Sequence, residues 1–271
     1  MSQYPIHKST QISDFGIYIQ PIETPKMYSH TDDFYIFGLV ESGSCRLNID
    51  FEDIDVIKGD IIIIRPGQVH RFVKSLDLIA TMLILDEVFI NESEQQLLEM
   101  YSFQKISLTD MNELKQLYSF LTCRLKYNQS ETSKTIVQRM AVTVVALVVD
   151  VIQKHQVSFV YDRRYKEITL KFRKLFKQYF KVSRIPSFYA NLLNISTSYL
   201  NEALHEVTGI SVSRNIQNEI VLMAKRELVY TSASVKEIAQ NLGFDDYSYF
   251  SRLFSKVTGV SPSNFRRTYC E

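Results

Sequence analysis

The sequence has few cysteines and no segment typical of a secreted protein. Cys45, Cys123 and Cys270 are the 3 cysteines among its 271 residues, and none forms part of a Cys-x-x-Cys pair. This spacing argues against a disulfide framework or a cysteine zinc site. Residues 1–5 contain no basic segment leading into an apolar run, so we expect no secretory signal. A cytoplasmic location is therefore expected.

Long apolar runs and catalytic motifs are missing as well. The most apolar run, residues 140–152, is too short to span a bilayer and contains Asp150. The sequence shows no Ser-His-Asp or Cys-His motif and no glycine-rich phosphate-binding loop. We therefore expect no membrane partner, no cofactor, no catalytic residue and no enzymatic activity.

The net charge of +1 hides an asymmetry between the two halves of the chain. Residues 1–162 contain 14 Lys and Arg against 21 Asp and Glu, a balance of −7. Residues 163–271 contain 17 against 9, a balance of +8. This asymmetry indicates that only the back half meets a polyanion. The length and the hydrophobic content of 45% favour two folded domains.

The front of the chain, residues 1–85, is rich in short β-forming runs separated by Gly and Pro turns. Residues 34–40 form one such run, which should end in a turn at 41–44. Residues 45–50 alternate apolar and polar, which predicts a strand with one buried face. This pattern is typical of a small antiparallel barrel or sandwich.

Two helices should follow the strands. Residues 107–127 have apolar side chains at helical spacing, with Ser107 or Thr109 as the expected N-cap. Residues 133–155 predict a helix that is apolar on more than one face. It is either an internal core helix, or it packs one face on the barrel and another on a second copy of the chain. Residues 156–162 lack periodicity and should link the halves.

The back half contains one pattern twice, ending in Val207-Thr208-Gly209 and again 50 residues later in Val257-Thr258-Gly259. Each copy predicts a short helix, a tight turn and a second helix, which is the pattern of a helix-turn-helix. Residues 211–230 predict a connecting helix, followed by a helix whose start is a capping box. The helix predicted at 163–182 is the most basic stretch and suits contact with phosphates.

The exposed faces of the two second helices should carry the DNA-binding side chains. Asn201 can form two hydrogen bonds with adenine, Glu202 can accept one from cytosine, and Arg252 can form two with guanine. Lys256 and the arginines at 266–267 suit phosphates. The candidate set is Ser198, Asn201, Glu202, His205, Tyr247, Ser248, Arg252 and Lys256. The alternative for each residue is a solvated helix face without a ligand.

Residues 165–271 resemble the DNA-binding domain of the AraC/XylS family of bacterial transcription regulators. The match is carried by Phe188-Tyr189-Ala190, Ser198-Tyr199-Leu200, both Val-Thr-Gly triplets, the run Ser248–Phe254 and Thr258–Pro262. The resemblance implies two helix-turn-helix units joined by a rigid helix, each inserted into a major groove on one face of the DNA. It assigns base contacts to Ser198, Asn201 and Glu202, and to Tyr247, Ser248 and Arg252. The family often has Arg where this chain has Glu202, which implies weaker or different contacts by the first unit.

The front half resembles, on fewer residues, the cupin-type barrel that such regulators carry for sensing and dimerisation. The resemblance is carried by Gly59-Asp60, Arg65-Pro66-Gly67 and His70. Metal-dependent cupins also use a His-x-His and a Glu. This chain has His30 and Glu41 but no His-x-His, so His70 is expected at a turn or barrel mouth and no metal site is assigned. A small-molecule pocket in the barrel is a further expectation, because the mouths of β-barrels often bind ligands.

The sequence thus predicts an α+β protein with two domains. Residues 1–156 form a cupin-like antiparallel β-barrel (1–85) with appended helices (107–155), and residues 163–271 form an all-α domain with two helix-turn-helix units joined by a linker helix. The predicted function is a dimeric, sequence-specific regulator that binds promoter DNA, with a small effector and RNA polymerase as further candidate partners. The alternatives are a cupin-type enzyme with an accessory DNA-binding module, and a protein-interaction module whose basic face is unused.

Overall fold

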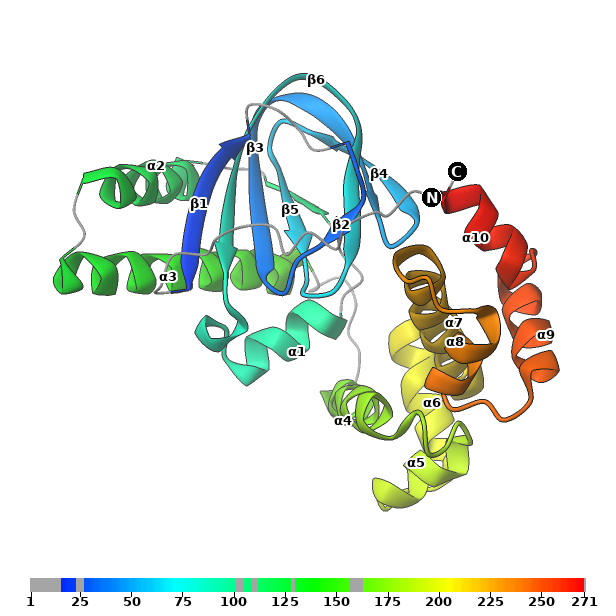
Figure 1. Ribbon diagram of the computed structural model, residues 1–271. Coiled ribbons are helices and arrows are strands. Elements are labelled where there is room, and N and C mark those ends of the chain that lie inside the picture. Colours follow the sequence, from blue (N-terminus) through cyan, green and yellow to red (C-terminus); the bar gives the residue numbers. More distant parts are fainter. Residues whose placement is uncertain are drawn as a thin grey trace. The chain divides into compact units, whose positions relative to one another are not determined.

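The computed structural model describes residues 16–22, 27–100, 105–108, 112–127, 130–155 and 163–270 (Figure 1). These residues fall into two compact units, one containing β1 to α3 and the other α4 to α10. The predicted α+β class with two domains is confirmed. The predicted linker, residues 156–162, lies outside the described residues.

The first unit is built on an antiparallel sheet in which the described residues form seven strands (Figure 1). Their order is β1-β6-β3-β5-β7, with β2 also paired to β6 and β4 to β3. The strands are β1 (Ile17–Ile22), β2 (His30–Thr31), β3 (Tyr35–Ile49), β4 (Glu52–Ile57), β5 (Asp60–Ile64), β6 (Val69–Leu85) and β7 (Lys105–Ser107). The long strands β3 and β6 pair along most of their length and form the centre of the sheet.

Strand β3 continues through residues 41–44, so the turn predicted there is wrong. The pairing of β3 with β6 shifts register twice between Val40 and Ser44, which is the signature of β-bulges. Bulges bend a strand without ending it. Gly43 takes a φ of 72° at this bend, a conformation that glycine adopts without steric strain.

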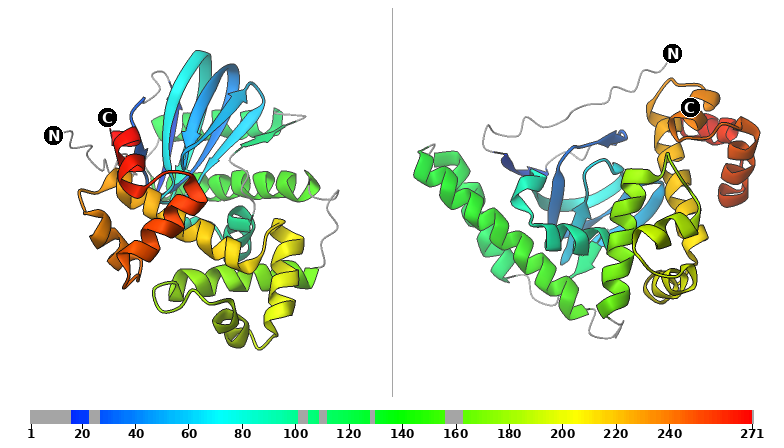
Figure 2. Two further views of the ribbon diagram at one scale, coloured as in Figure 1. Left: turned by 90° about the vertical axis from the view of Figure 1, so that its right-hand side faces the viewer. Right: turned by 90° about the horizontal axis from the view of Figure 1, so that it is seen from below.

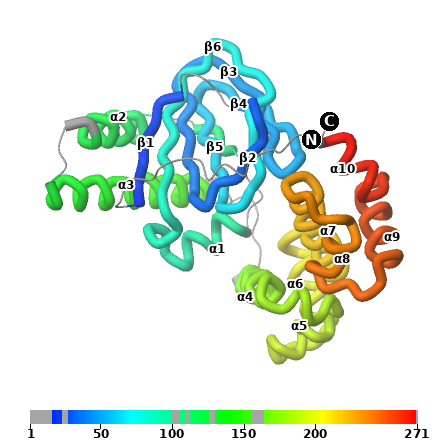
Figure 3. The backbone as a smooth tube through the Cα atoms, viewed as in Figure 1, coloured from blue at the N-terminus to red at the C-terminus, as the bar shows by residue number. Residues whose placement is uncertain are grey.

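The sheet is buried on both faces, in two separate apolar clusters. Phe37 and Leu83 belong to the cluster that the helices cover, whereas Ile36 and Ile84 belong to the other. Neighbouring residues of a strand point to opposite faces, which explains this division. The strands of this sheet curl round, as the backbone trace shows (Figure 3). Both faces of β5 are buried, which explains why its residues Ile61–Ile64 are all apolar.

Three α-helices accompany the sheet in the described residues: α1 (Glu92–Met100), α2 (Asn112–Tyr127) and α3 (Glu131–His155). A short 3₁₀ helix, η1 (Glu87–Phe89), precedes α1. Ser107 ends strand β7, and its hydroxyl donates to Asp60 Oδ1 at 2.6 Å, so its prediction as a helix N-cap is wrong. The other candidate, Thr109, lies outside the described residues.

Helix α3 packs one face into the helix-covered cluster. Val137, Val144, Val148 and Ile152 are buried there at 2% exposure or less. The helix is long and apolar enough to cross a membrane by composition alone. Its packing against the sheet accounts for the apolar character of the buried face, because helices covering a sheet bury one stripe.

In the second unit, the regular secondary structure of the described residues consists of α-helices joined by short turns and loops (Figure 2). Its helices are α4 (Arg163–Tyr179), α5 (Pro186–Leu192), α6 (Thr197–Thr208), α7 (Val212–Tyr230), α8 (Val235–Asn241), α9 (Tyr247–Thr258) and α10 (Pro262–Cys270). The predicted capping box at Ser234 and Glu237 is confirmed. Glu237 N donates to Ser234 Oγ at 3.2 Å, and Ser234 N donates to Glu237 Oε2 at 2.6 Å.

We expect Gly43→Ala to destabilise the first unit far more than Gly67→Ala. Both glycines have a φ of 72°, so each substitution strains the backbone by about 1–2 kcal/mol. A Cβ at position 43 would also overlap the backbone of Leu76 and Asp77, whereas one at position 67 would meet nothing within 4 Å. Urea unfolding followed by circular dichroism should show the difference, and equal losses in the two variants would contradict the steric explanation.

Candidate nucleic-acid interface

Two helix-turn-helix units, α5–α6 and α8–α9, have the same local construction. Ser196 caps α6 and Asp246 caps α9, each by accepting a hydrogen bond from a backbone N–H in the first turn. Gly209 and Gly259 end these helices in the left-handed conformation, with φ of 74° and 81°. The repeat predicted from the sequence therefore describes two equivalent units with equivalent helix ends.

The threonine of each Val-Thr-Gly triplet hydrogen-bonds to the backbone of its own helix. The Thr208 hydroxyl lies 2.7 Å from the carbonyl oxygen of Leu204, and the Thr258 hydroxyl lies 2.9 Å from that of Phe254. Leu204 and Phe254 are themselves fully buried. Each threonine thus adds a side-chain hydrogen bond to the backbone in the last turn of the second helix of its helix-turn-helix unit, hereafter the reading helix.

Helix α7 joins the two units. Its 19 residues span about 28 Å at 1.5 Å per residue. Arg266 of α10 donates from Nε to Leu228 O at 2.8 Å and from Nη2 to Ala233 O at 2.6 Å. This side chain fastens α10 to the C-terminal end of α7, which gives Arg266 a structural role. Its phosphate contact stays a prediction. Arg267 is exposed.

All eight predicted DNA-binding side chains are exposed. Helix α6 carries Ser198, Asn201, Glu202 and His205, and helix α9 carries Tyr247, Ser248, Arg252 and Lys256. The structure therefore gathers the predicted residues into one group on each second helix. Their contact with DNA stays a prediction.

Asn201 has a structural hydrogen bond that the sequence did not reveal. Its Oδ1 accepts from the backbone N–H of Val212, the first residue of α7, at 3.2 Å. In the second helix-turn-helix unit, 50 residues later, Ser251 and Pro262 occupy the two positions. Proline has no N–H and suits the first turn of a helix, so no acceptor is needed there. Asn201 therefore supplies a hydrogen-bond acceptor that only the first of the two helix-turn-helix units requires.

Glu202 is held by helix α4. The Tyr165 hydroxyl donates to Glu202 Oε1 at 2.7 Å, and the Arg164 guanidinium lies 5.3 Å from the centre of the Tyr199 ring. In α9, by contrast, Arg252 lies 3.8 Å from Asp246 Oδ2, and both side chains are largely exposed. The first reading helix, α6, is thus tied to α4 by specific contacts, and the arginine of the second, α9, has a loose ion pair.

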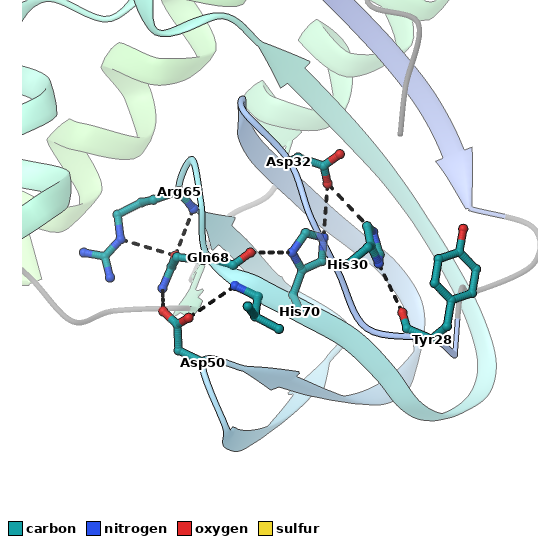
Figure 4. Close-up of polar contacts among 8 residues, drawn as sticks. Tyr28, His30, Asp32, Asp50, Arg65, Gln68 and His70 are labelled. Carbon is teal, nitrogen blue, oxygen red and sulfur yellow. Dashed lines mark hydrogen bonds and ion pairs between the residues drawn. The ribbon is translucent and has the colours of Figure 1, made fainter. Parts of the chain in front are cut away.

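In the sheet-containing unit, β1 to α3, His70 lies within strand β6 and is 4% exposed. It is therefore a buried strand residue. His30 and Asp32 lie beside it (Figure 4). Burial lowers the pKa of His70 below its usual range, and the neighbouring His30 lowers it further. Glu41 lies elsewhere on β3, where its Oε1 accepts from the Thr81 hydroxyl at 3.0 Å. No motif in the sequence marks Asp32 as a member of this group.

A cavity of about 400 Å³ lies between the sheet and α2. Glu41 and Thr81 line it from the sheet, and Lys115, Tyr118, Ser119, Thr122 and Cys123 line it from the helix. Tyr118 is anchored by a 2.8 Å hydrogen bond from its hydroxyl to Phe37 O. The cavity therefore has charged and hydroxyl groups on a rigid support.

Comparisons with known protein families agree with both units. Residues 189–268 match the model of a helix-turn-helix domain, and residues 17–110 match the model of the AraC-like ligand binding domain. The chain belongs to the AraC/XylS family of transcription regulators. The cupin-like fold predicted for the front half is compatible with that ligand-binding domain.

Individual relatives support this family assignment. The arabinose operon regulatory protein of Escherichia coli is 40% identical over 72 residues, which are 27% of this chain and 25% of that protein. The Msm operon regulatory protein of Streptococcus mutans is 22% identical over 237 residues, covering 87% of this chain and 84% of that protein. ToxT from Vibrio cholerae shares the fold with a TM-score of 0.50 and 14% identity, covering 94% of this chain and all of that one.

We expect Asn201→Ala to lower the stability of the helical unit, because it leaves the Val212 N–H without its acceptor. Loss of a helix-start acceptor costs about 0.5–2 kcal/mol. His205→Ala, on an exposed side chain of the same helix, should leave stability unchanged. Urea unfolding of the two variants measures the difference, and an unchanged midpoint for Asn201→Ala would show that the hydrogen bond contributes nothing.

Proposed function

We propose that this protein is a sequence-specific regulator that binds promoter DNA through α6 and α9. The observation that carries the proposal is the pair of equivalent helix-turn-helix units, each presenting its predicted base-reading side chains to solvent. A helix-turn-helix reads base edges in the major groove from the first turns of its second helix. Membership of a family of cytoplasmic transcription regulators supports the same function.

The charge of the second unit favours a DNA partner. Helix α4 presents the exposed side chains of Lys171, Lys174 and Lys177, and α9 presents Arg252 and Lys256. Cations placed along a phosphate backbone release bound counterions, which makes binding strongly dependent on salt. The first reading helix offers Glu202 at the position where the family often has Arg. We infer that α9 supplies more of the electrostatic attraction and α6 more of the hydrogen-bond discrimination.

Selection from a pool of random duplexes with the full-length protein tests the function directly. One sequence family should be enriched. Its affinity should fall by at least about 10³-fold between 50 and 200 mM salt, as expected for six or more phosphate contacts. Failure to enrich any sequence, or binding that is insensitive to salt, would refute the proposal and favour the protein-interaction alternative.

Arg252→Ala and Lys256→Ala should have different effects on the selected site. Loss of the forked Arg252 contact should cost about 1–3 kcal/mol and relax the preference at one base pair. Loss of Lys256 should weaken binding to all sequences alike and reduce the salt slope by about one. Fluorescence anisotropy on the selected site and its single-base variants separates the two effects. Equal losses on specific and random DNA for Arg252→Ala would exclude its role in base reading.

We further propose that the protein dimerises through the outer face of α3. Arg139, Val142, Ala146 and Asp150 share one face, because they are spaced three or four residues apart. Arg139, Val142 and Ala146 are exposed, and Asp150 is half-buried. If two such helices pair antiparallel about a twofold axis, the small apolar residues meet at the centre. Each Arg139 then lies opposite Asp150 of the second copy, which gives a self-complementary surface.

Ala146→Arg should convert the dimer to a monomer, because it brings two like charges together at the centre of this surface. Thr132→Arg adds the same side chain near the N-terminal end of α3 and should leave the dimer intact. Light scattering coupled to size exclusion gives the mass of each variant. A wild-type protein with the mass of one chain, or an Ala146→Arg variant that still dimerises, would rule out this interface.

Control by a small effector is the third part of the proposal. The first unit matches a ligand-binding domain, and it contains the cavity between the sheet and α2. Lys115 and Glu41 give this cavity charges of both signs, so it suits a small polar molecule. RNA polymerase is the partner through which a bound promoter would be activated.

A further inference from the structure

The first unit contains a group of three potential metal ligands that the DNA-binding function does not use. His30 and His70 are directly opposite each other in the pairing of β2 with β6, and their ring centres are 4.2 Å apart. Asp32 follows His30 by two residues, which places both side chains on the same side of an extended chain. Their three ligand atoms all lie within 4.8 Å of one another.

The hydrogen bonds of the two imidazole rings determine which nitrogens face inward. His30 Nδ1 lies 3.1 Å from Tyr28 O, and His70 Nδ1 lies 3.1 Å from Gln68 O (Figure 4). A carbonyl oxygen only accepts, so each Nδ1 carries the proton of its hydrogen bond. In the neutral ring, Nε2 then presents a lone pair. Both Nε2 atoms face Asp32 Oδ2, at 3.8 Å for His30 and 3.4 Å for His70.

Three lone-pair donors that point at one another are favourable when a cation lies between them. The observed spacing fits a metal ion, because ligands at about 2.1 Å in a tetrahedral arrangement lie about 3.4 Å from each other. The His70–Asp32 distance matches this value, and the His30–Asp32 distance exceeds it by a few tenths of an ångström. Small side-chain rotations would therefore complete the site.

Neighbouring residues hold the three side chains in position through hydrogen bonds. The Gly67 N–H donates to Asp32 O at 2.9 Å and holds the backbone of the aspartate. Gln68, whose carbonyl orients His70, is fixed in turn by Asp50, which accepts from its Nε2 at 2.8 Å. A metal-binding histidine typically donates its other N–H to a carbonyl or carboxylate, which sets the tautomer and the ring orientation. His30, Asp32 and His70 are 7%, 4% and 4% exposed, so water has little access to the cluster.

We propose that His30, Asp32 and His70 bind one divalent transition-metal ion in the first unit. Two imidazole nitrogens and one carboxylate oxygen suit zinc and its neighbours in the first transition row, and they disfavour magnesium and calcium, which take oxygen ligands. The set differs from the His-x-His and Glu of metal-dependent cupins. Asp32 takes the place of the second histidine, two residues after His30, and Glu41 accepts a hydrogen bond from Thr81. Three protein ligands leave a coordination position open for water or for an oxygen atom of a small molecule.

Zinc titration of the full-length protein, after removal of metal with a chelator, tests the site. We expect one tightly bound Zn²⁺ per chain and no competition by Mg²⁺. His30→Gln, Asp32→Asn and His70→Gln should each weaken binding by more than about 100-fold, the upper end of the loss caused by removing an outer-layer partner. Asp33→Asn is the matched control, because Asp33 is the exposed neighbour of Asp32 and its loss should leave the affinity unchanged.

Two outcomes would overturn the proposal: no zinc binding by the folded wild-type protein, or equal binding by all four variants, which indicates adventitious surface histidines. If a ligand variant fails to fold by circular dichroism, anomalous scattering from wild-type crystals grown with zinc decides the question. A peak about 2.0–2.2 Å from the three ligand atoms supports the site, and peaks only elsewhere exclude it. None of these measurements uses DNA, so their result is independent of promoter binding.

Discussion

Burial of one side of each reading helix is the interaction on which the DNA-binding surface depends. Leu200 and Leu204 of α6, and Phe250 and Phe254 of α9, are completely buried. Each such side chain contributes about 1.5–3 kcal/mol on leaving water, which is more than any single exposed contact provides. This burial determines how each helix is rotated. Asn201 and Glu202 of α6 and Arg252 of α9 then face solvent. The order of residues in the sequence selects which side chains can reach a base.

The helical unit was predictable because its signals are local. Serine and aspartate caps, the capping box of α8 and the glycines that end α6 and α9 each act within a few residues, and the spacing of apolar residues defines the buried faces. The roles of Asn201 and Arg266 were not predictable, because their partners lie elsewhere in the chain: Val212 and Leu228 are in α7, and Ala233 is in the loop after it. An exposed polar residue on a reading helix looks the same in the sequence whether it meets a base or a neighbouring backbone group.

The sheet was harder to predict for a related reason. A β-bulge and a turn both use Gly and Ser, so the run at 41–44 does not distinguish a strand that bends from one that ends. The alternation at 45–50 did predict the inward residues of β3 correctly. The group around His70 depends on cross-strand register, because residue 30 faces residue 70 only after β2 has paired with β6. A search for His-x-His could not find it, since the third donor is an aspartate.

The hydrogen bond between Tyr165 and Glu202 has a mechanical consequence. Helix α4 is the first described element after the predicted linker, and Tyr165 is in its first turn. A twist applied to the chain at that point would reach the first reading helix across this one side-chain contact. It would reach the second helix-turn-helix unit through Arg184, which follows α4 and donates from Nη1 to Leu242 O, at the end of α8, at 3.0 Å. A signal that arrives at α4 would then act on both reading helices together, and the two half-sites of a promoter would respond as one.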